Sequence, residues 1–171
     1  MDGMLLSDGE AVSGLGGGLC QLSNLLYWIF LHAETEIVER YHHSKDVFPD
    51  SGRTLPFGSG ATIFDNYIDL KVKNISNSDI QIKIWMTDDA LKVQLLSDSP
   101  SAKKFHVFEK NHCFVKKGER YFRHNEIYRK TSVAGVMKKE ELIATNFAPV
   151  LYKVTPKYVS EHGFEVIEIS A

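Results

Sequence analysis

The sequence contains little cysteine: Cys20 and Cys113 are the only two among 171 residues. A small secreted domain that depends on disulfides normally carries more, so a reducing compartment is favoured, and the two thiols are expected to be free of each other. No apolar run reaches the roughly 20 residues that cross a bilayer. The N-terminus also lacks a basic segment followed by an apolar one, which excludes a visible signal peptide. These absences predict a cytoplasmic or membrane-peripheral protein without a transmembrane segment.

The chain also lacks a large excess of either positive or negative charge. The formal net charge is only -2, so the whole chain gives no reason to expect a nucleic-acid partner. The hydrophobic content of 43% and the length are those of a globular protein with a sizeable core. We expect one domain over residues 1–171. It consists of a lead-in or short hairpin at 1–13, a helix-and-strand core at 14–90 and a strand-rich part at 91–171.

The pattern of apolar residues predicts one long, largely buried helix followed by many strands. A helical stripe over residues 20–33 is formed by Leu19, Leu22, Leu26, Ile29, Phe30 and Ala33. Alternation over 67–74 and 79–86 predicts a hairpin with its turn in NISNSD. Strands are also expected at 35–43, 91–96, 104–109, 112–116, 119–130 and 164–169, a loop at 44–60, and a short helix or turn at 138–144. The fold class is therefore α+β, with the helix packed on a mainly antiparallel sheet, a layout that transglutaminase-like enzymes also have.

Four glycines lie within residues 14–18, directly before Cys20. In the first turn of a helix, unpaired backbone N–H groups favour a thiolate over a thiol. Glycines let a substrate approach closely and tolerate positive φ. The same N–H groups, with the Gln21 side chain, can stabilise the oxyanion that forms when a thiolate attacks a carbonyl. The pattern favours a reactive thiol, while a small buried hydrophobe remains the alternative, because free cysteine is often buried.

A catalytic thiol needs a base and an orienting acceptor. His42 and His43 lie on the next predicted strand, and Asp69 lies on the polar face of the one after it. Only one of two adjacent strand histidines can face the thiol. The alternatives are surface histidines and a solvated aspartate. The cysteines and histidines show no paired-ligand spacing, so no metal is expected.

Basic residues concentrate between 103 and 130. They are Lys103, Lys104, Lys110, Lys116, Lys117, Arg120, Arg123, Arg129 and Lys130, against three glutamates, and they alternate with aromatic residues. Such a stretch can bind an anionic polymer, or it can be the outer face of a sheet.

The segments GGGLCQLS (16–23), ERYHH (39–43), GATI (60–63) and DLKVKN (69–74) resemble the VanW family, named for an accessory protein of B-type vancomycin-resistance clusters. Gly60 departs from the pattern, which usually has Asp there. The resemblance favours His43 over His42. It also implies a bacterial origin and a link to the cell envelope or glycopeptide resistance, but no established reaction.

Two hypotheses follow. In the first, the protein is a thiol enzyme acting on an acyl or amide group of a peptidoglycan precursor or peptide, with Cys20 as nucleophile, His43 as base and Asp69 as orienter. In the second, it is a non-catalytic binding or accessory module that uses the same glycine-lined pocket. Neither requires a cofactor, and the oligomeric state is undetermined. The residues expected to bind the ligand or oxyanion are Gly17, Gly18, Gln21, Ser23, Arg40 and His42.

Overall fold

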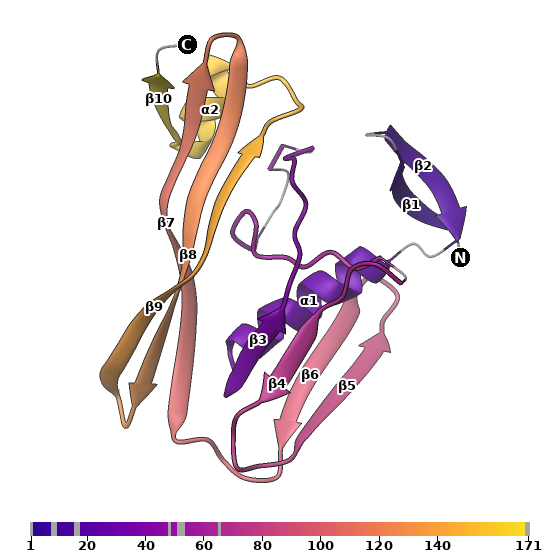
Figure 1. The fold of residues 1–171 in the computed structure, drawn as a ribbon, viewed down its shortest axis with the longest axis vertical. Helices are drawn as coiled ribbons and strands as arrows, with labels where there is room; N and C mark the ends of the chain where they lie inside the picture. The colour runs from indigo at the N-terminus through magenta and orange to yellow at the C-terminus, as the bar shows by residue number, and fades with distance from the viewer. Residues whose placement is uncertain are drawn as a thin grey trace. The chain divides into compact units, whose positions relative to one another are not determined.

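The computed structural model describes residues 2–7, 10–15, 18–47, 49–50, 54–64 and 66–169, with the backbone alone for 2–7 and 10–15. The elements, shown in Figure 1, are β1 (Asp2–Ser7), β2 (Glu10–Leu15), α1 (Leu19–Leu31), β3 (Thr35–Glu39), β4 (Lys71–Asn74), β5 (Ile80–Met86), β6 (Leu91–Ser97), β7 (Lys103–Lys117), β8 (Arg120–Val133), β9 (Val136–Pro149), α2 (Pro156–His162) and β10 (Glu165–Ile169). Two short helices and mainly antiparallel strands confirm the α+β class.

The chain divides into two compact units that interleave along the sequence. Unit 1 comprises Met1–His42 and Gly60–Ser101, and unit 2 comprises His43–Ser59 and Ala102–Ala171. The assignment of residues 1–171 to a single domain stays a prediction. Among the described residues, no helix combines the length and the apolar character that crossing a membrane requires.

In unit 1, α1 contacts β3 and β6. Its buried residues are Ser23, Tyr27, Phe30 and Leu31, whereas Leu19 is 51% exposed. The helix is therefore shorter and less buried than the sequence predicted. It ends where the Thr35 hydroxyl donates to the carbonyl oxygen of Phe30 at 2.6 Å. β1 and β2 pair antiparallel, in agreement with the short hairpin that was one of the two alternatives expected for the lead-in.

The predicted hairpin of 67–74 with 79–86 is wrong. β4 pairs antiparallel with β3, and β5 pairs antiparallel with β6. The polar run between them does turn: the Asn74 amide donates to the Ser78 carbonyl at 2.7 Å and accepts from the Ser76 N–H at 3.0 Å. The turn is local, however, and each strand finds its partner elsewhere in the unit.

Unit 2 is built on a four-stranded sheet in the order β10-β7-β8-β9, parallel only between β10 and β7. Figure 1 shows β7, β8 and β9 as long twisted strands running side by side. Segments 104–109 and 112–116, expected as two strands, belong to β7 alone, which bulges near Asn111, where φ is 54°. Residues 138–144 lie within β9, so the prediction of a helix or turn there is wrong: this segment pairs antiparallel with β8, and Glu140 and Glu141 form ion pairs with Lys130 and Arg129 of that strand.

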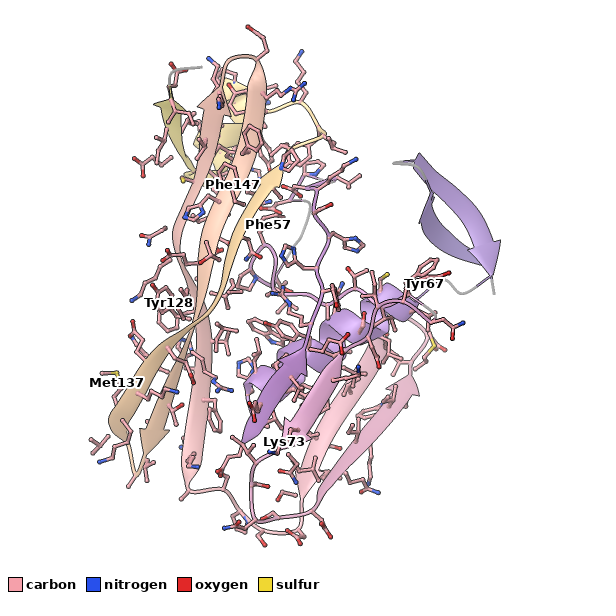
Figure 2. All side chains as sticks on the ribbon, in the orientation of Figure 1. Phe57, Tyr67, Lys73, Tyr128, Met137 and Phe147 are labelled. Atoms are coloured by element: carbon pink, nitrogen blue, oxygen red, sulfur yellow. The ribbon has the colours of Figure 1, made fainter. Side chains whose placement is uncertain are left out.

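The sequence analysis missed α2. Thr155 accepts a hydrogen bond from the Tyr158 N–H, proline opens the helix, and Gly163 follows its end with a φ of 66°. These are the start and stop signals of a short helix. Tyr158 and Phe164 pack against Phe114, which is fully buried in the unit's core. Along β9, Met137 and Phe147 are 59% and 55% exposed (Figure 2).

Candidate functional site

The first turn of α1 presents Cys20 to solvent. Gly18 precedes the helix with a φ of 93°, a conformation that glycine adopts without strain, and no side chain caps the helix. No acidic residue lies in this turn, Cys20 is exposed and free, and Gln21 is exposed beside it. The N–H groups of the turn can therefore bind an anion or a thiolate. Gly17 lies outside the described residues.

The next turn of α1 holds the segment 60–62. The Ser23 hydroxyl, 2% exposed, donates to the Ala61 carbonyl at 2.5 Å and lies 3.1 Å from the Cys20 carbonyl. The Asn24 side-chain oxygen accepts from the Ala61 N–H at 2.8 Å. A Cβ added to Gly60 would fall on the Asn24 amide. Gly60 thus permits the close approach that these hydrogen bonds need.

Arg40 also binds this segment. Its Nε donates to the Gly60 carbonyl at 2.9 Å, and its guanidinium lies 4.5 Å from the centre of the Tyr27 ring. Burial lowers the pKa of this guanidinium, and the nearby Tyr27 partly offsets that effect. The structure therefore brings together Ser23, Arg40 and Gly60, three residues of the motif segments, in a hydrogen-bonded clamp on α1.

The other expected site residues lie as follows. His42 is exposed and belongs to unit 1, and His43 is exposed and begins unit 2. Asp69 is exposed, and its carboxylate accepts from the Leu70 N–H at 2.8 Å. The grouping of Cys20, His43 and Asp69 stays a prediction. Within the described ranges, no cluster of three or more histidine, cysteine or acidic residues is arranged to hold a metal ion.

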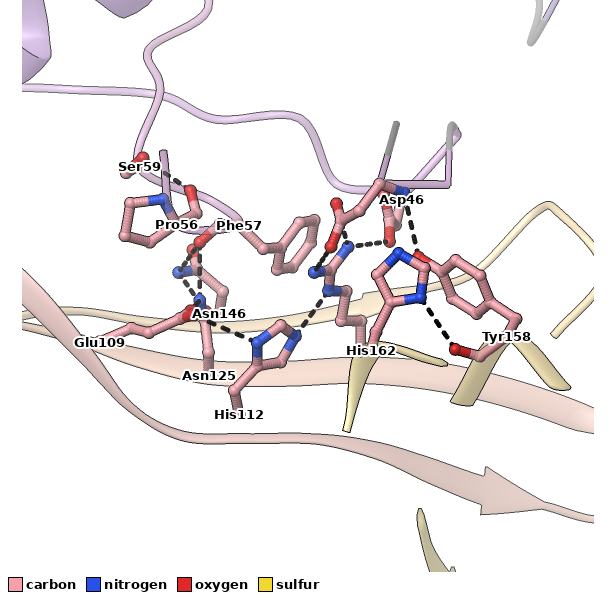
Figure 3. A network of polar contacts seen from close by, with 12 residues as sticks. Asp46, Pro56, Phe57, Ser59, Glu109, His112, Asn125, Asn146, Tyr158 and His162 are labelled. Atoms are coloured by element: carbon pink, nitrogen blue, oxygen red, sulfur yellow. Dashed lines mark hydrogen bonds and ion pairs between the residues drawn. The ribbon is translucent and has the colours of Figure 1, made fainter. Parts of the chain in front are cut away.

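A buried polar network in unit 2 was not anticipated from the sequence (Figure 3). Arg123, 1% exposed, forms hydrogen-bonded ion pairs with Asp46 and Asp50. Its guanidinium also lies 4.7 Å from the centre of the Phe57 ring. Burial lowers the pKa of Arg123, but the two carboxylates outweigh it and raise the pKa above its ordinary value. The only available signal was an arginine among alternating core residues, and a surface strand shows the same pattern.

Two asparagines complete this network. The amides of Asn125 and Asn146 both donate to the Phe57 carbonyl, at 2.8 and 3.3 Å, and Asn146 donates to Asn125 at 2.8 Å. The described residues of 43–59, called the anchored segment below, are therefore attached to the sheet by side chains of β8 and β9.

The basic stretch 103–130 is largely neutralised. Five of its nine cations pair with carboxylates outside the stretch: Lys110 and Lys130 with Glu140, Arg129 with Glu141, Lys116 with Glu168, and Arg123 as described. Such cross-strand pairs favour the outer face of a sheet over a polymer-binding surface. Binding of an anionic polymer there stays a prediction.

Comparison with known proteins gives a consistent set of relatives. A family model described as "VanW like protein" matches residues 1–96. The vancomycin B-type resistance protein VanW of Enterococcus faecalis is 37% identical over 97 residues, covering 57% of this chain and 35% of that protein. The uncharacterized protein YoaR of Bacillus subtilis is 33% identical over 93 residues, covering 54% of this chain and 29% of its own length. The chain thus spans about a third of the length of these curated relatives. No solved structure matches it.

Proposed function

Because the chain belongs to the VanW family, we propose that it acts at the bacterial cell envelope in a process related to glycopeptide resistance, with Cys20 as the nucleophile of a reaction on an acyl or amide group. The link to resistance rests on the name of the Enterococcus relative. The substrate class that fits is a peptidoglycan precursor or a peptide.

The observation that carries the proposal is the exposed Cys20 in an uncapped first helical turn. In the proposed reaction, His43 takes the proton of the Cys20 thiol. The thiolate then attacks the acyl carbon and the carbonyl electrons move to oxygen, where N–H groups of the turn and Gln21 stabilise the charge. As the C–N bond breaks, the leaving amine takes a proton from His43. Water or a second amine then releases the acyl group from the thioester.

A non-catalytic binding or accessory role is the second candidate. It is favoured by the clamp on α1, because Ser23 and Arg40 use their polar atoms to hold the Gly60–Ala61 backbone. On this view, the motif residues maintain a shaped pocket, and the thiol need not react.

Alkylation of the full chain by iodoacetamide, followed by mass spectrometry of each cysteine between pH 5.5 and 8.5, separates the two candidates. Cys113 is 5% exposed, and burial together with the nearby Glu165 raises the pKa of its thiol, so it serves as an internal slow reference. If the thiol is catalytic, Cys20 reacts at pH 6 faster than glutathione under the same conditions.

His43→Ala is expected to slow Cys20 alkylation at pH 6, whereas the matched variant His42→Ala leaves it unchanged. Circular dichroism verifies that both variants fold. If Cys20 in the parent follows the pH profile of glutathione and His43→Ala matches the parent, the catalytic proposal fails and the binding role replaces it.

A further inference from the structure

His112 connects Arg123 to the rest of the polar network in unit 2 (Figure 3). The Nε of Arg123 donates to His112 Nε2 at 2.8 Å. An arginine side chain stays protonated, so this imidazole nitrogen must be the acceptor and carry no proton. The other ring nitrogen, Nδ1, lies 3.3 Å from the Glu109 carboxylate and can donate to it. The hydrogen bonds therefore require a neutral imidazole with its proton on Nδ1.

Groups of opposite charge contact the His112 imidazole. Among the described residues, Glu109 of β7 favours a protonated imidazole and Arg123 of β8 disfavours it, with Asp46 and Asp50 beyond the arginine. The Phe164 ring covers the imidazole, 4.6 Å between centroids, and His162 of α2 stacks on that phenyl ring. Burial raises the pKa of the Glu109 carboxyl, but hydrogen bonds from His112 and Asn125 outweigh it and hold that pKa below its usual range.

We propose that His112 is a proton-controlled switch on the attachment of the anchored segment, residues 43–59. When the imidazole takes up a proton, its Nε2–H points at the Nε–H of Arg123, and the two donors repel each other. The guanidinium must then move away from the ring, which weakens the hydrogen bonds that it donates to Asp46 and Asp50.

This inference does not rest on the thiol chemistry. It concerns the anchored segment, which belongs to unit 2 together with His112 and Arg123.

Hydrogen exchange of backbone amides in the full chain, corrected for intrinsic rates and compared at pH 5.0 and 7.5, tests the switch. The reporters are the amides of Asp46, which donates to the Pro149 carbonyl at 3.0 Å, and Asp50, which donates to the Tyr158 hydroxyl at 3.0 Å. Their protection should fall about ten- to hundredfold at pH 5.0, the range expected for losing one hydrogen bond to a charged group. The Val150 amide, which donates to Tyr121 on β8 at 2.9 Å, should change little.

His112→Gln places a carbonyl oxygen that accepts from Arg123 at either pH, so both reporters should stay equally protected. The control His106→Gln changes an exposed histidine of the same strand and should keep the pH dependence of the parent. Equal protection of the reporters in the parent at both pH values would overturn the proposal, as would a pH dependence retained in His112→Gln. If that variant does not fold, ring ¹⁵N shifts of the parent decide: an Nε2–H tautomer of His112 at pH 7.5 refutes it.

Discussion

Replacing Gly58 by alanine should destabilise unit 2 far more than the same change at a glycine of equal backbone geometry. Gly58 has a φ of 71°, and a side chain in this region costs about 1–2 kcal/mol. A Cβ there would also overlap the side-chain amide of Asn146. Asn146 is 2% exposed and donates to Asn125 and to the Phe57 carbonyl, so it cannot move without losing those bonds.

The expected loss follows from these contacts. Leaving a buried polar group without its partner costs about 1–3 kcal/mol. Added to the backbone cost, this gives about 2–5 kcal/mol for Gly58→Ala. Gly135→Ala is the matched control, because Gly135 has a φ of 77° and nothing within 4 Å of an added Cβ. The control should lose only the backbone cost of about 1–2 kcal/mol.

Urea unfolding followed by far-ultraviolet circular dichroism measures both losses. The two tryptophans, Trp28 and Trp85, belong to unit 1, so their fluorescence reports on that unit separately. Equal losses for Gly58→Ala and Gly135→Ala would refute the packing of Gly58 on Asn146.

Two further predictions concern charge in unit 2. Arg123→Met leaves Asp46 and Asp50 without their cation, which for a buried pair costs about 3–5 kcal/mol in the same urea assay. Lys110→Met breaks an exposed pair with Glu140 and should cost much less. Equal costs for the two variants would contradict the burial of the Arg123 pairs. Because the folded state lowers the pKa of Glu109, its carboxylate stabilises the fold above the unfolded pKa of about 4.3, and that contribution disappears as the pH falls through the folded value. Glu109→Gln should therefore be less stable than the parent at pH 7, with a gap in urea midpoint that narrows at pH 3.5; a constant gap would argue against this linkage.

Local signals in the sequence predicted most of the elements. The apolar spacing located α1, alternation located β4, β5 and β6, and the Lys-Gly turn joined β7 to β8. The pairing of strands could not be predicted in the same way. β3 and β4 are far apart in the sequence, and the polar turn between β4 and β5 indicates a hairpin of those two strands just as strongly. Residues 138–144 also have a helical composition, but they pair antiparallel with β8 as part of a long strand.

The candidate site was also predictable only where local sequence signals indicate it. The glycines before Cys20 indicated an exposed thiol, and the structure has one in the first turn of α1. The clamping roles of Ser23 and Arg40 were not visible, because the backbone carbonyls that they bind leave no mark on residue identity. The network around Arg123 joins residues more than 70 positions apart, and a single sequence carries no trace of such a contact.

The interleaving of the two units along the sequence limits which fragments of the chain can be expressed on their own. The family match ends at residue 96, and it includes residues 43–59, whose hydrogen-bonding partners Arg123, Asn125, Asn146 and Tyr152 are all encoded downstream. A fragment expressed from the matched region would carry Asp46 and the Phe57 carbonyl without the groups that neutralise or bind them. During synthesis, the same segment leaves the ribosome well before its partners exist. The region that matches the family and the structural units therefore have different boundaries. A fragment for expression must follow the boundaries of the units.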